Sequence, residues 1–276
     1  MVRFIWSAVI LLAATAASFA QDNTQRGSMS TVPPDVVKDL APTGKLRAAI
    51  NLGNSVLAQK KDNGEIGGVT ADLARELARR AGLELQLVPF EAAGKVFEAL
   101  KSNAWDLAFL AIEPVRAAEI DFTPPYVIIE GTYMVRVDSP LKKIEDVDKP
   151  GIRIAVGRGS AYDLYLTRTL KNATLERAHT GGGRAMIDLF FDQNLDVAAG
   201  VKQPLVAYAK TDPKVRVMDG RFMEIQQAMG TPKGRSAATL ATLRGFIEEM
   251  KGSGFVAEAL KRSNQPDAAV APPATN

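Results

Sequence analysis

Arg116 and the turn at residues 157–160 are the features of this sequence best suited to bind a small anion. Arg116 lies four residues beyond the apolar run of residues 105–112, and α/β sheets place ligand-binding groups just past the ends of such strands. A planar guanidinium can hold a carboxylate through two parallel hydrogen bonds. The alternative is a surface ion pair with Glu113 or Glu119, which the spacing by itself leaves open.

The turn Gly157-Arg158-Gly159-Ser160 leads into a predicted helix over residues 161–170. The first backbone N–H groups of a helix have no partner within it and lie at the positive end of its dipole, so this turn suits an anion. Glycine turns of this kind also occur simply to pack a strand against a helix, and the motif alone is therefore weak evidence.

Nucleophilic and metal chemistry has few candidate residues. The chain contains no cysteine, and His179 is its only histidine, which excludes disulfides, thiolate nucleophiles and cysteine-based metal sites. A serine–histidine triad would have to use His179, and no nucleophile-elbow motif is present. The sequence therefore predicts no catalytic residue, no metal site and no cofactor.

The N-terminus has the pattern of a secretory signal peptide. Arg3 precedes a short apolar run, and residues 18–20 form a small-x-small cleavage site. We expect a signal peptide over residues 1–20 and a mature periplasmic protein; an uncleaved anchor is the alternative. Residues 21–39 are predicted to be a flexible leader, and the Ala- and Pro-rich residues 264–276 a disordered tail.

Predicted strands and helices alternate along the rest of the chain. Strands are expected at residues 45–50, 83–90, 105–112, 152–156, 195–199 and 215–218, and helices at 70–80, 95–101, 161–170, 185–191 and 204–209. Thr70 is the expected N-cap of the first helix. Such alternation predicts an α/β fold with parallel sheets covered by helices.

The β-α-β-α-β order occurs twice, which predicts two lobes. The extended stretches at residues 127–137 and 222–230 are the expected crossings between them. Lobe 1 would then comprise residues 40–129 and 224–263, and lobe 2 residues 130–223. The 34 basic and 31 acidic residues are interspersed, so we expect no nucleic-acid partner.

Several segments in this order resemble the extracellular solute-binding proteins of family three, the polar-amino-acid receptors of ABC transporters. They are residues 64–74 (GEIGGVTADLA), 103–108 (NAWDLA), 116–126 (RAAEIDFTPPY), 139–141 (SPL), 144–147 (IEDV), 156–160 (VGRGS) and 195–199 (LDVAA). The resemblance covers residues 44–263. It implies a type II periplasmic-binding-protein fold, in which two hinge strands join the lobes and a small-molecule ligand closes the cleft. It also implies a monomer recognised by an inner-membrane permease/ATPase complex.

The resemblance assigns the carboxylate of the ligand to Arg116, with further contacts from Gly159 and Ser160. Gly53 and Asn54, which follow the first strand, are expected to line the cleft, although Gly-Asn is equally suited to a tight turn.

Other expected site positions depart from the family pattern. The aspartates that hold a ligand ammonium align with Asn51 and with a position near Val201, the stacking aromatic residue aligns near Ala92, and the family hydroxyl aligns with Ala111. An ammonium without an anionic partner in a closed cleft is costly. We therefore hypothesise an organic acid or another anionic solute.

Glu130 and Gln203 are candidate replacement contacts from the hinge and lobe 2. Glu130 could also restore an ammonium partner, which would defeat the organic-acid hypothesis. Two other classes of protein stay open. A cyclohexadienyl-dehydratase-like enzyme on the same fold would need a proton donor, for which Glu130 is the candidate. A signalling receptor lobe would need a separate membrane partner.

Overall fold

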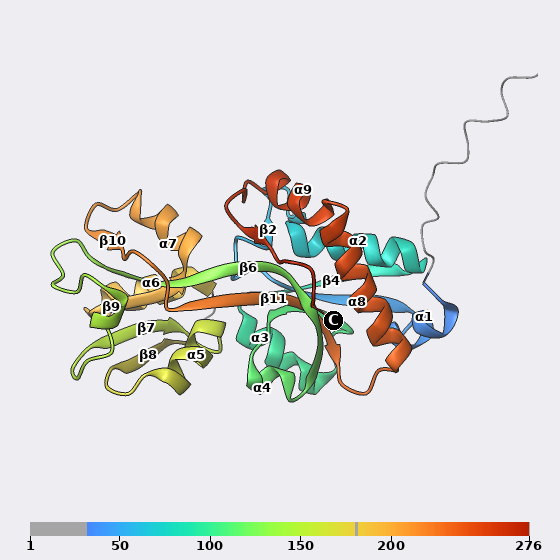
Figure 1. Cartoon of the computed structure of the whole chain (residues 1–276), viewed down its shortest axis with the longest axis horizontal. Helices are drawn as coiled ribbons and strands as arrows, with labels where there is room; N and C mark the ends of the chain where they lie inside the picture. Colours follow the sequence, from blue (N-terminus) through green and yellow to red (C-terminus); the bar gives the residue numbers. More distant parts are fainter. Residues whose placement is uncertain (1–31, 180–181, 276) are drawn as a thin grey trace, which may run out of the picture. The chain divides into compact units, whose positions relative to one another are not determined.

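A computed structural model describes residues 32–179 and 182–275 (Figure 1). The predicted signal peptide and residues 21–31 of the predicted leader lie outside the described residues. Within the described part of the chain, no helix combines the length and the apolarity needed to cross a membrane.

The strands form one large mixed sheet and one small ladder. Their bounds are β1 (Lys45–Asn51), β2 (Gln59–Lys60), β3 (Ile66–Gly67), β4 (Glu84–Phe90), β5 (Leu107–Ala111), β6 (Ile120–Arg136), β7 (Arg153–Gly157), β8 (Thr174–Ala178), β9 (Val197–Val201), β10 (Val215–Val217), β11 (Met223–Pro232) and β12 (Ala269–Val270). The order of the large sheet is β4-β1-β5-β11-β6-β9-β7-β8, with β10 and β12 paired to β6. Strands β2 and β3 pair with each other.

Helices cover this sheet. They are α1 (Pro34–Leu40), α2 (Val69–Ala81), α3 (Ala93–Glu98), α4 (Pro114–Ala117), α5 (Ala161–Thr169), α6 (Gly182–Asp192), α7 (Lys202–Ala209), α8 (Ala237–Gly252) and α9 (Phe255–Arg262), with short 3₁₀ turns at Ala99–Ser102 and Ile144–Asp146. The predicted alternation of strands and helices is confirmed.

Two parallel sets of strands lie on either side of a central antiparallel pair. Strands β4, β1 and β5 are parallel and belong to what we call the first lobe. Strands β9, β7 and β8 are parallel and belong to the second lobe. The long strands β6 and β11 pair antiparallel between them, and they contain the predicted crossings. They join the two expected sheets into one continuous sheet, whereas the exact lobe boundaries remain a prediction.

The start of α2 differs from the expected one. Gly68 is the N-cap, with a φ of 104°, and a Cβ atom there would lie 2.4 Å from the carbonyl oxygen of Leu57. Thr70 lies inside the first turn, and its Oγ1 donates to that same carbonyl at 3.2 Å. The prediction of Thr70 as N-cap is therefore wrong, because the close backbone contact decides where the helix begins.

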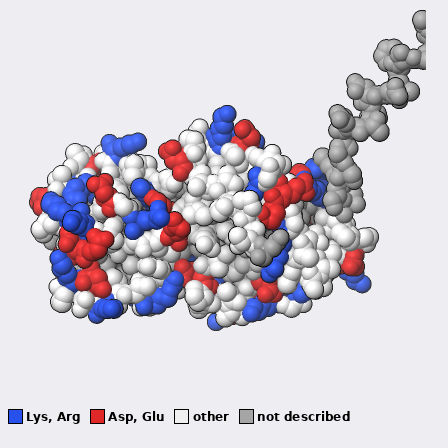
Figure 2. Space-filling model, viewed as in Figure 1, with Lys and Arg blue, Asp and Glu red and all other residues white. Residues whose placement is uncertain are grey.

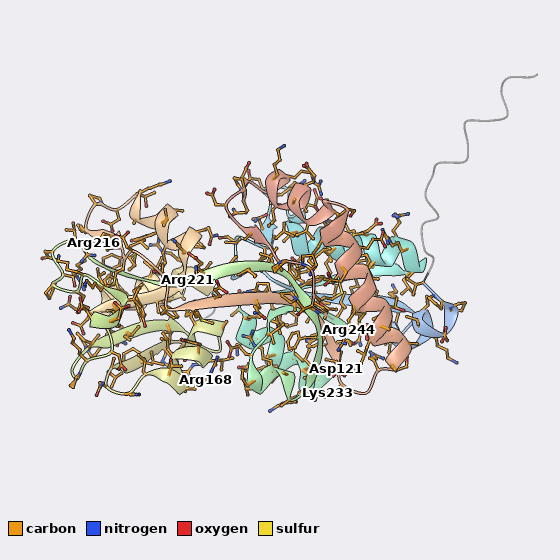
Figure 3. All side chains as sticks on the ribbon, viewed as in Figure 1. Asp121, Arg168, Arg216, Arg221, Lys233 and Arg244 are labelled. Carbon is orange, nitrogen blue, oxygen red and sulfur yellow. The ribbon has the colours of Figure 1, made fainter. Side chains whose placement is uncertain are left out.

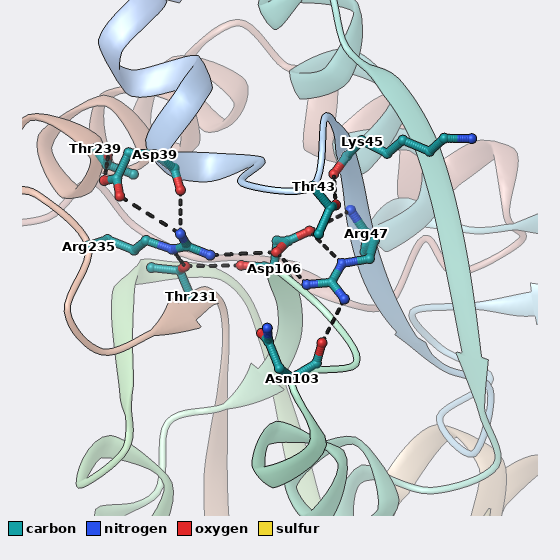
Figure 4. A network of polar contacts seen from close by, with 9 residues as sticks. All are labelled: Asp39, Thr43, Lys45, Arg47, Asn103, Asp106, Thr231, Arg235 and Thr239. Carbon is teal, nitrogen blue, oxygen red and sulfur yellow. Dashed lines mark hydrogen bonds and ion pairs between the residues drawn. The ribbon is translucent and has the colours of Figure 1, made fainter.

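The end of the predicted leader is helical rather than flexible. Two buried side chains, Val36 and Leu40, anchor α1 to the core, and proline suits the first turn of a helix. Asp39 joins α1 to α8 (Figure 4), because its Oδ2 accepts from the backbone N–H of Ser236 at 2.8 Å and from Oγ1 of Thr239 at 2.6 Å. The composition of this segment gave no indication that Val36 and Leu40 would be buried or that Asp39 would bind α8.

Residues 264–275 are also ordered, so the predicted disordered tail is wrong for them. Strand β12 pairs with β6 at Val127 and Ile128, and the backbone N–H of Ala271 donates to Tyr126 O at 3.1 Å. Lys251 Nζ donates to Pro272 O at 2.8 Å. The unpaired edge of β6 provides backbone partners for this segment, which its Ala- and Pro-rich composition does not reveal.

The surface view of the described residues shows Lys and Arg interspersed with Asp and Glu rather than gathered by sign (Figure 2). In the interior, Trp105 is fully buried in the first lobe, and its Nε1 donates to Val96 O at 2.9 Å. In the second lobe, Met134, Phe190 and Leu205 belong to a separate apolar cluster. Each lobe therefore has buried side chains that hold its strands in place.

Candidate functional site

The carboxyl ends of four strands meet at one cavity. Asn51, Ala111, Gly157 and Val201 are the last residues of β1, β5, β7 and β9, and all four line it. Ligands of α/β sheets bind outside the carboxyl ends of the strands, and here the two lobes contribute two strand ends each. The cavity has a volume of about 70 Å³.

The lining is polar on one side and largely apolar elsewhere. The described polar residues are Asn51, Asn54, Arg116, Arg158, Ser160, Tyr162 and Gln227. The apolar side chains are Ala92, Ala93, Leu110, Ala111, Ala161, Met186, Ile187, Val201, Pro204, Leu205 and Ile225, with glycines at positions 53, 157 and 183. No carboxylate occurs among these residues.

Arg116 lies on α4, and its side chain is almost completely buried, with 1% exposed. Its Nη1 donates to Ala111 O at 3.0 Å and its Nη2 to Gly159 O at 2.8 Å. Its Nε has no hydrogen-bond partner among the described residues. Burial lowers the pKa of Arg116 to about 10, against the opposing effect of the negative charge of Glu113. The guanidinium therefore remains protonated at neutral pH.

The alternative of an ion pair between Arg116 and a neighbouring glutamate is not what the structure shows. Glu113 pairs instead with Nη1 of Arg168. Arg168 lies on α5 of the second lobe (Figure 3). No described carboxylate forms an ion pair with Arg116. A buried cation whose only partners are carbonyl oxygens has an unsatisfied electrostatic requirement.

The two lobes contact each other directly beside Arg116. Gly94, on α3, and Gly159 approach so closely that a Cβ atom on Gly94 would lie 2.9 Å from Arg158 O. Gly159 itself has a φ of 69°, a conformation that favours glycine. The Arg116–Gly159 hydrogen bond and the Glu113–Arg168 ion pair cross at the same place. Together these contacts link the two lobes beside the cavity.

The turn before α5 is only partly available to a ligand. Ser160 caps the helix, accepting from the backbone N–H of Asp163 at 3.0 Å. The N–H of Gly159 donates to Asp163 Oδ2 at 2.8 Å, and Gly159 contacts Arg116 without lining the cavity. The N–H groups of Ala161 and Tyr162, the first two helical residues, have no partner among the described residues. They are the donors of this turn that a ligand can use.

The turn after β1 is both a tight turn and part of the cavity wall, the two roles that the sequence left open. Asn51 Oδ1 accepts from the N–H of Gly53 at 3.0 Å, and Asn54 Oδ1 accepts from the N–H of Val56 at 3.3 Å. These bonds make a local turn. Asn51, Gly53 and Asn54 also line the cavity, so the predicted turn and the predicted cleft wall coincide.

Glu130 and Gln203 do not lie in this cavity, and their placement there is corrected. Both line a separate groove of about 1020 Å³ beside β6, α7 and the C-terminal segment. Glu130 is paired with Lys202 and Arg221, each at 2.7 Å, and hydrogen bonding to Lys202 is the first cause of its lowered pKa, opposed by partial burial. Alternation along β6 sends this side chain to the face away from the cavity.

Gln227 and Tyr162 are polar lining residues that the sequence reasoning missed; Gln227 belongs to a strand that crosses between the lobes. Gln227 lies on β11 directly opposite Ala111 of β5, and only 6% of it is exposed. Ile225, two residues earlier, also lines the cavity, as expected for one face of a strand. Its neighbour Gln226 is also polar but exposed, so the sequence offered no local signal that singles out Gln227.

The described part of the chain contains no recognisable metal site. Among these residues, no cluster of three or more His, Asp or Glu side chains is arranged to hold a metal ion. The chemistry of the cavity is therefore that of hydrogen-bond donors, one buried cation and apolar contacts.

Comparison with known proteins places this geometry in a family. The family model described as bacterial extracellular solute-binding proteins, family 3, matches residues 46–264. A solved structure of a solute receptor for L-cysteine from Neisseria gonorrhoeae is 23% identical, with a TM-score of 0.71, covering 83% of this chain and 94% of that one.

Two further structures have the same fold. The amino acid ABC transporter substrate-binding protein AbpA from Streptococcus pneumoniae, bound to L-arginine, is 19% identical, with a TM-score of 0.70 and coverage of 83% and 98%. The ancestral amino-acid-binding protein AncCDT-1, a precursor of cyclohexadienyl dehydratase, is 23% identical, with a TM-score of 0.67 and coverage of 82% and 98%. At these identities the likeness establishes the two-lobed type II periplasmic-binding-protein fold.

Proposed function

Because the chain belongs to the bacterial extracellular solute-binding proteins of family 3, we propose that it is the periplasmic substrate-binding component of an ABC transporter. It binds a small carboxylate-bearing solute between its lobes and delivers the closed complex, as a monomer, to a permease/ATPase complex in the inner membrane. The observation that carries the carboxylate assignment is the buried guanidinium of Arg116, which no described carboxylate neutralises.

A ligand carboxylate satisfies what the protein leaves incomplete. Arg116 Nε lacks a partner, and hydrogen bonds between charged groups contribute roughly 1.5–3 kcal/mol each. The first N–H groups of α5, at Ala161 and Tyr162, line the same cavity and favour negative charge. The carboxylate would thus be held by both lobes at once, which couples binding to closure.

Closure itself is supported by the contacts at the mouth of the cavity. Arg116 reaches Gly159, and Glu113 reaches Arg168, from the first lobe to the second. The crossing strands β6 and β11 are the connections about which the lobes would separate. A transporter can then distinguish the closed, loaded protein from the open one by shape.

The enzyme alternative loses its candidate proton donor. Glu130, on which a dehydratase-like reaction depended, lines the other groove rather than this cavity, and hydrogen bonding to Lys202 lowers its pKa, so it is ionised at neutral pH. A general acid must lie within hydrogen-bond reach of the leaving group. Release of phenylpyruvate from prephenate by the purified protein would nevertheless contradict our proposal that it binds without turnover.

A thermal-shift screen of the mature protein tests the proposed function. Carboxylic acids and amino acids are screened beside matched neutral amides and amines. A ligand that binds only the folded state stabilises it by about 2.7 kcal/mol at one hundred times its Kd. We expect stabilisation by carboxylates alone, and none in Arg116→Ala. Stabilisation by a solute without a carboxylate, retained in Arg116→Ala, would overturn the assignment.

A further inference from the structure

Most polar side chains among the described lining residues can donate hydrogen bonds, and none of them is a carboxylate. The hydroxyls of Ser160 and Tyr162 can also accept. Asn51 and Asn54 each use the side-chain oxygen inside the turn, accepting from the backbone N–H groups of Gly53 and Val56. A backbone N–H can only donate, so it fixes which end of each amide is the oxygen. The two Nδ2 groups, which have no partner among the described residues, are left for the ligand.

Arg116 and Arg158 add further donors and no acceptors. Arg158 lines the cavity and has no hydrogen bond or ion pair to another described residue. The guanidinium of Arg116 donates to the carbonyl oxygens of Ala111 and Gly159. Of these two residues only Ala111 lines the cavity, so Arg116 reduces the capacity of one lining carbonyl to accept from a ligand.

Gln227 is the one lining amide whose oxygen remains uncommitted. Neither end of its side chain has a hydrogen bond to another described residue, although the residue is 6% exposed. It lies opposite Ala111, whose carbonyl accepts from Arg116. Its single neutral oxygen cannot satisfy three ammonium protons or balance a positive charge.

The remaining walls are apolar and limit the size of the ligand. Met186, Ile187, Val201 and Leu205 line the cavity from the second lobe, and Ile225 lines it from β11. The cavity, with a volume of about 70 Å³, is small compared with most ligand pockets. A compact ligand with an aliphatic part would match these walls.

We infer that the ligand is a short aliphatic 2-oxo acid, whose carboxylate binds Arg116 and whose second polar group is an oxygen acceptor rather than an ammonium. The inference rests on the proposed function and refines its ligand class. A 2-oxo oxygen accepts from the amide donors of Asn51, Asn54 or Gln227, whereas an ammonium at the same carbon would face these donors and the guanidinium.

Matched ligands that differ at one atom test this inference by calorimetric titration. The C3 series is pyruvate, lactate and alanine; the C5 series is 2-oxoisovalerate, 2-hydroxyisovalerate and valine. We expect the oxo acid of at least one series to bind at least tenfold more tightly than its amino acid, with the hydroxy acid between them. An amino acid that binds as tightly as its oxo acid overturns the inference but leaves the proposed function standing. No binding in either series also overturns the inference.

A pair of variants isolates the role of charge in this discrimination. Val201 lies at the end of β9 on the apolar wall, and Val201→Asp places an acceptor with negative charge there. Val201→Asn is the matched control, because it has the same shape without the charge. We expect Val201→Asp alone to raise the ratio of valine to 2-oxoisovalerate affinity at least tenfold. Equal ratios in the two variants, with both folded by circular dichroism, would contradict the inference.

Discussion

Two buried ionic groups, Asp106 and Arg116, lie at opposite ends of the same strand β5, and only one of them is neutralised. Asp106 is fully buried, and its Oδ1 and Oδ2 accept from Arg47 Nη2 at 2.8 Å and Nε at 2.9 Å (Figure 4). Arg235 adds a second cation at 3.5 Å. Arg116 is equally buried but has only carbonyl partners.

This difference distinguishes a charge that is compensated within the protein from the charge that we propose binds the ligand. Every described partner of Asp106 comes from elements that form the first lobe, so its network is complete without a ligand (Figure 4). Arg116 instead draws on Gly159 of the second lobe and still has an unpartnered Nε. Burial of a charge is therefore a sign of function only where its compensation is incomplete.

Removal of Asp106 should have the largest effect, and the effect should be on folding. Asp106→Ala leaves Arg47 and Arg235 without their shared carboxylate, and breaking such a buried pair costs about 3–5 kcal/mol. Urea unfolding followed by circular dichroism measures this loss. A change of less than about 1 kcal/mol, the range of an exposed ion pair, would place Asp106 outside the structural network.

Arg116→Ala should show the opposite pattern. We expect affinity for the carboxylate ligand to fall about 100-fold or more, equivalent to about 2.7 kcal/mol, because the charge-assisted hydrogen bonds are lost. The free energy of unfolding without ligand should fall less than in Asp106→Ala, because Arg116→Ala leaves no described ion-pair partner buried and loses only packing and two hydrogen bonds to carbonyls. Retained affinity, or unfolding comparable to Asp106→Ala, would remove the contrast between the two charges.

Arg168→Ala tests whether closure depends on the ion pair beside the cavity. In the closed form the variant leaves Glu113, which is 2% exposed, buried without its ion-pair partner. In an open form the two residues would already be apart, so only the closed form loses stability. We expect about a tenfold loss of affinity through a smaller closed population, and a larger radius of gyration in small-angle scattering with ligand present. Arg184→Ala, which removes the exposed Arg184–Asp188 pair, is the control and should change neither measurement.

Gln227→Met should have the smallest effect and concerns selectivity. Loss of one neutral hydrogen bond, worth about 0.5–1.5 kcal/mol, should weaken 2-oxoisovalerate roughly threefold to tenfold while leaving isovalerate unchanged. Gln226 precedes it on β11 and is exposed outside the cavity, so Gln226→Met is the control. Equal losses for both ligands would show that Gln227 contributes packing rather than recognition.

Strand ends and helix starts were predictable here because they depend on short-range patterns. The apolar run before Arg116 and the glycine turn before Ser160 predicted where two walls of the cavity lie, and both residues line it. Parallel strands bring such ends together at one edge of a sheet. Gln227 escaped because nothing local distinguishes it from Gln226; only the pairing of β11 with β5 shows which of them faces inward.

The positions of Glu130 and of the C-terminal segment were not predicted, for a related reason. Glu130 lies on a crossing strand, where a change of face moves a side chain from one groove to another. Strand β12 has only two residues, and the free edge of β6 determines its order. The residue composition of these two segments does not reveal either property.

The α/β alternation, the family and the candidate anion-binding role of Arg116 could be inferred from the residues alone, because periodicity and residue chemistry are local. Tertiary structure alone decided which charges are compensated. Asp106 meets Arg47 and Arg235 from distant elements, whereas Arg116 meets only carbonyl oxygens. Whether a charge is neutralised depends on the distances between residues in the folded chain. The contrast between Asp106 and Arg116 is therefore visible only in the tertiary structure.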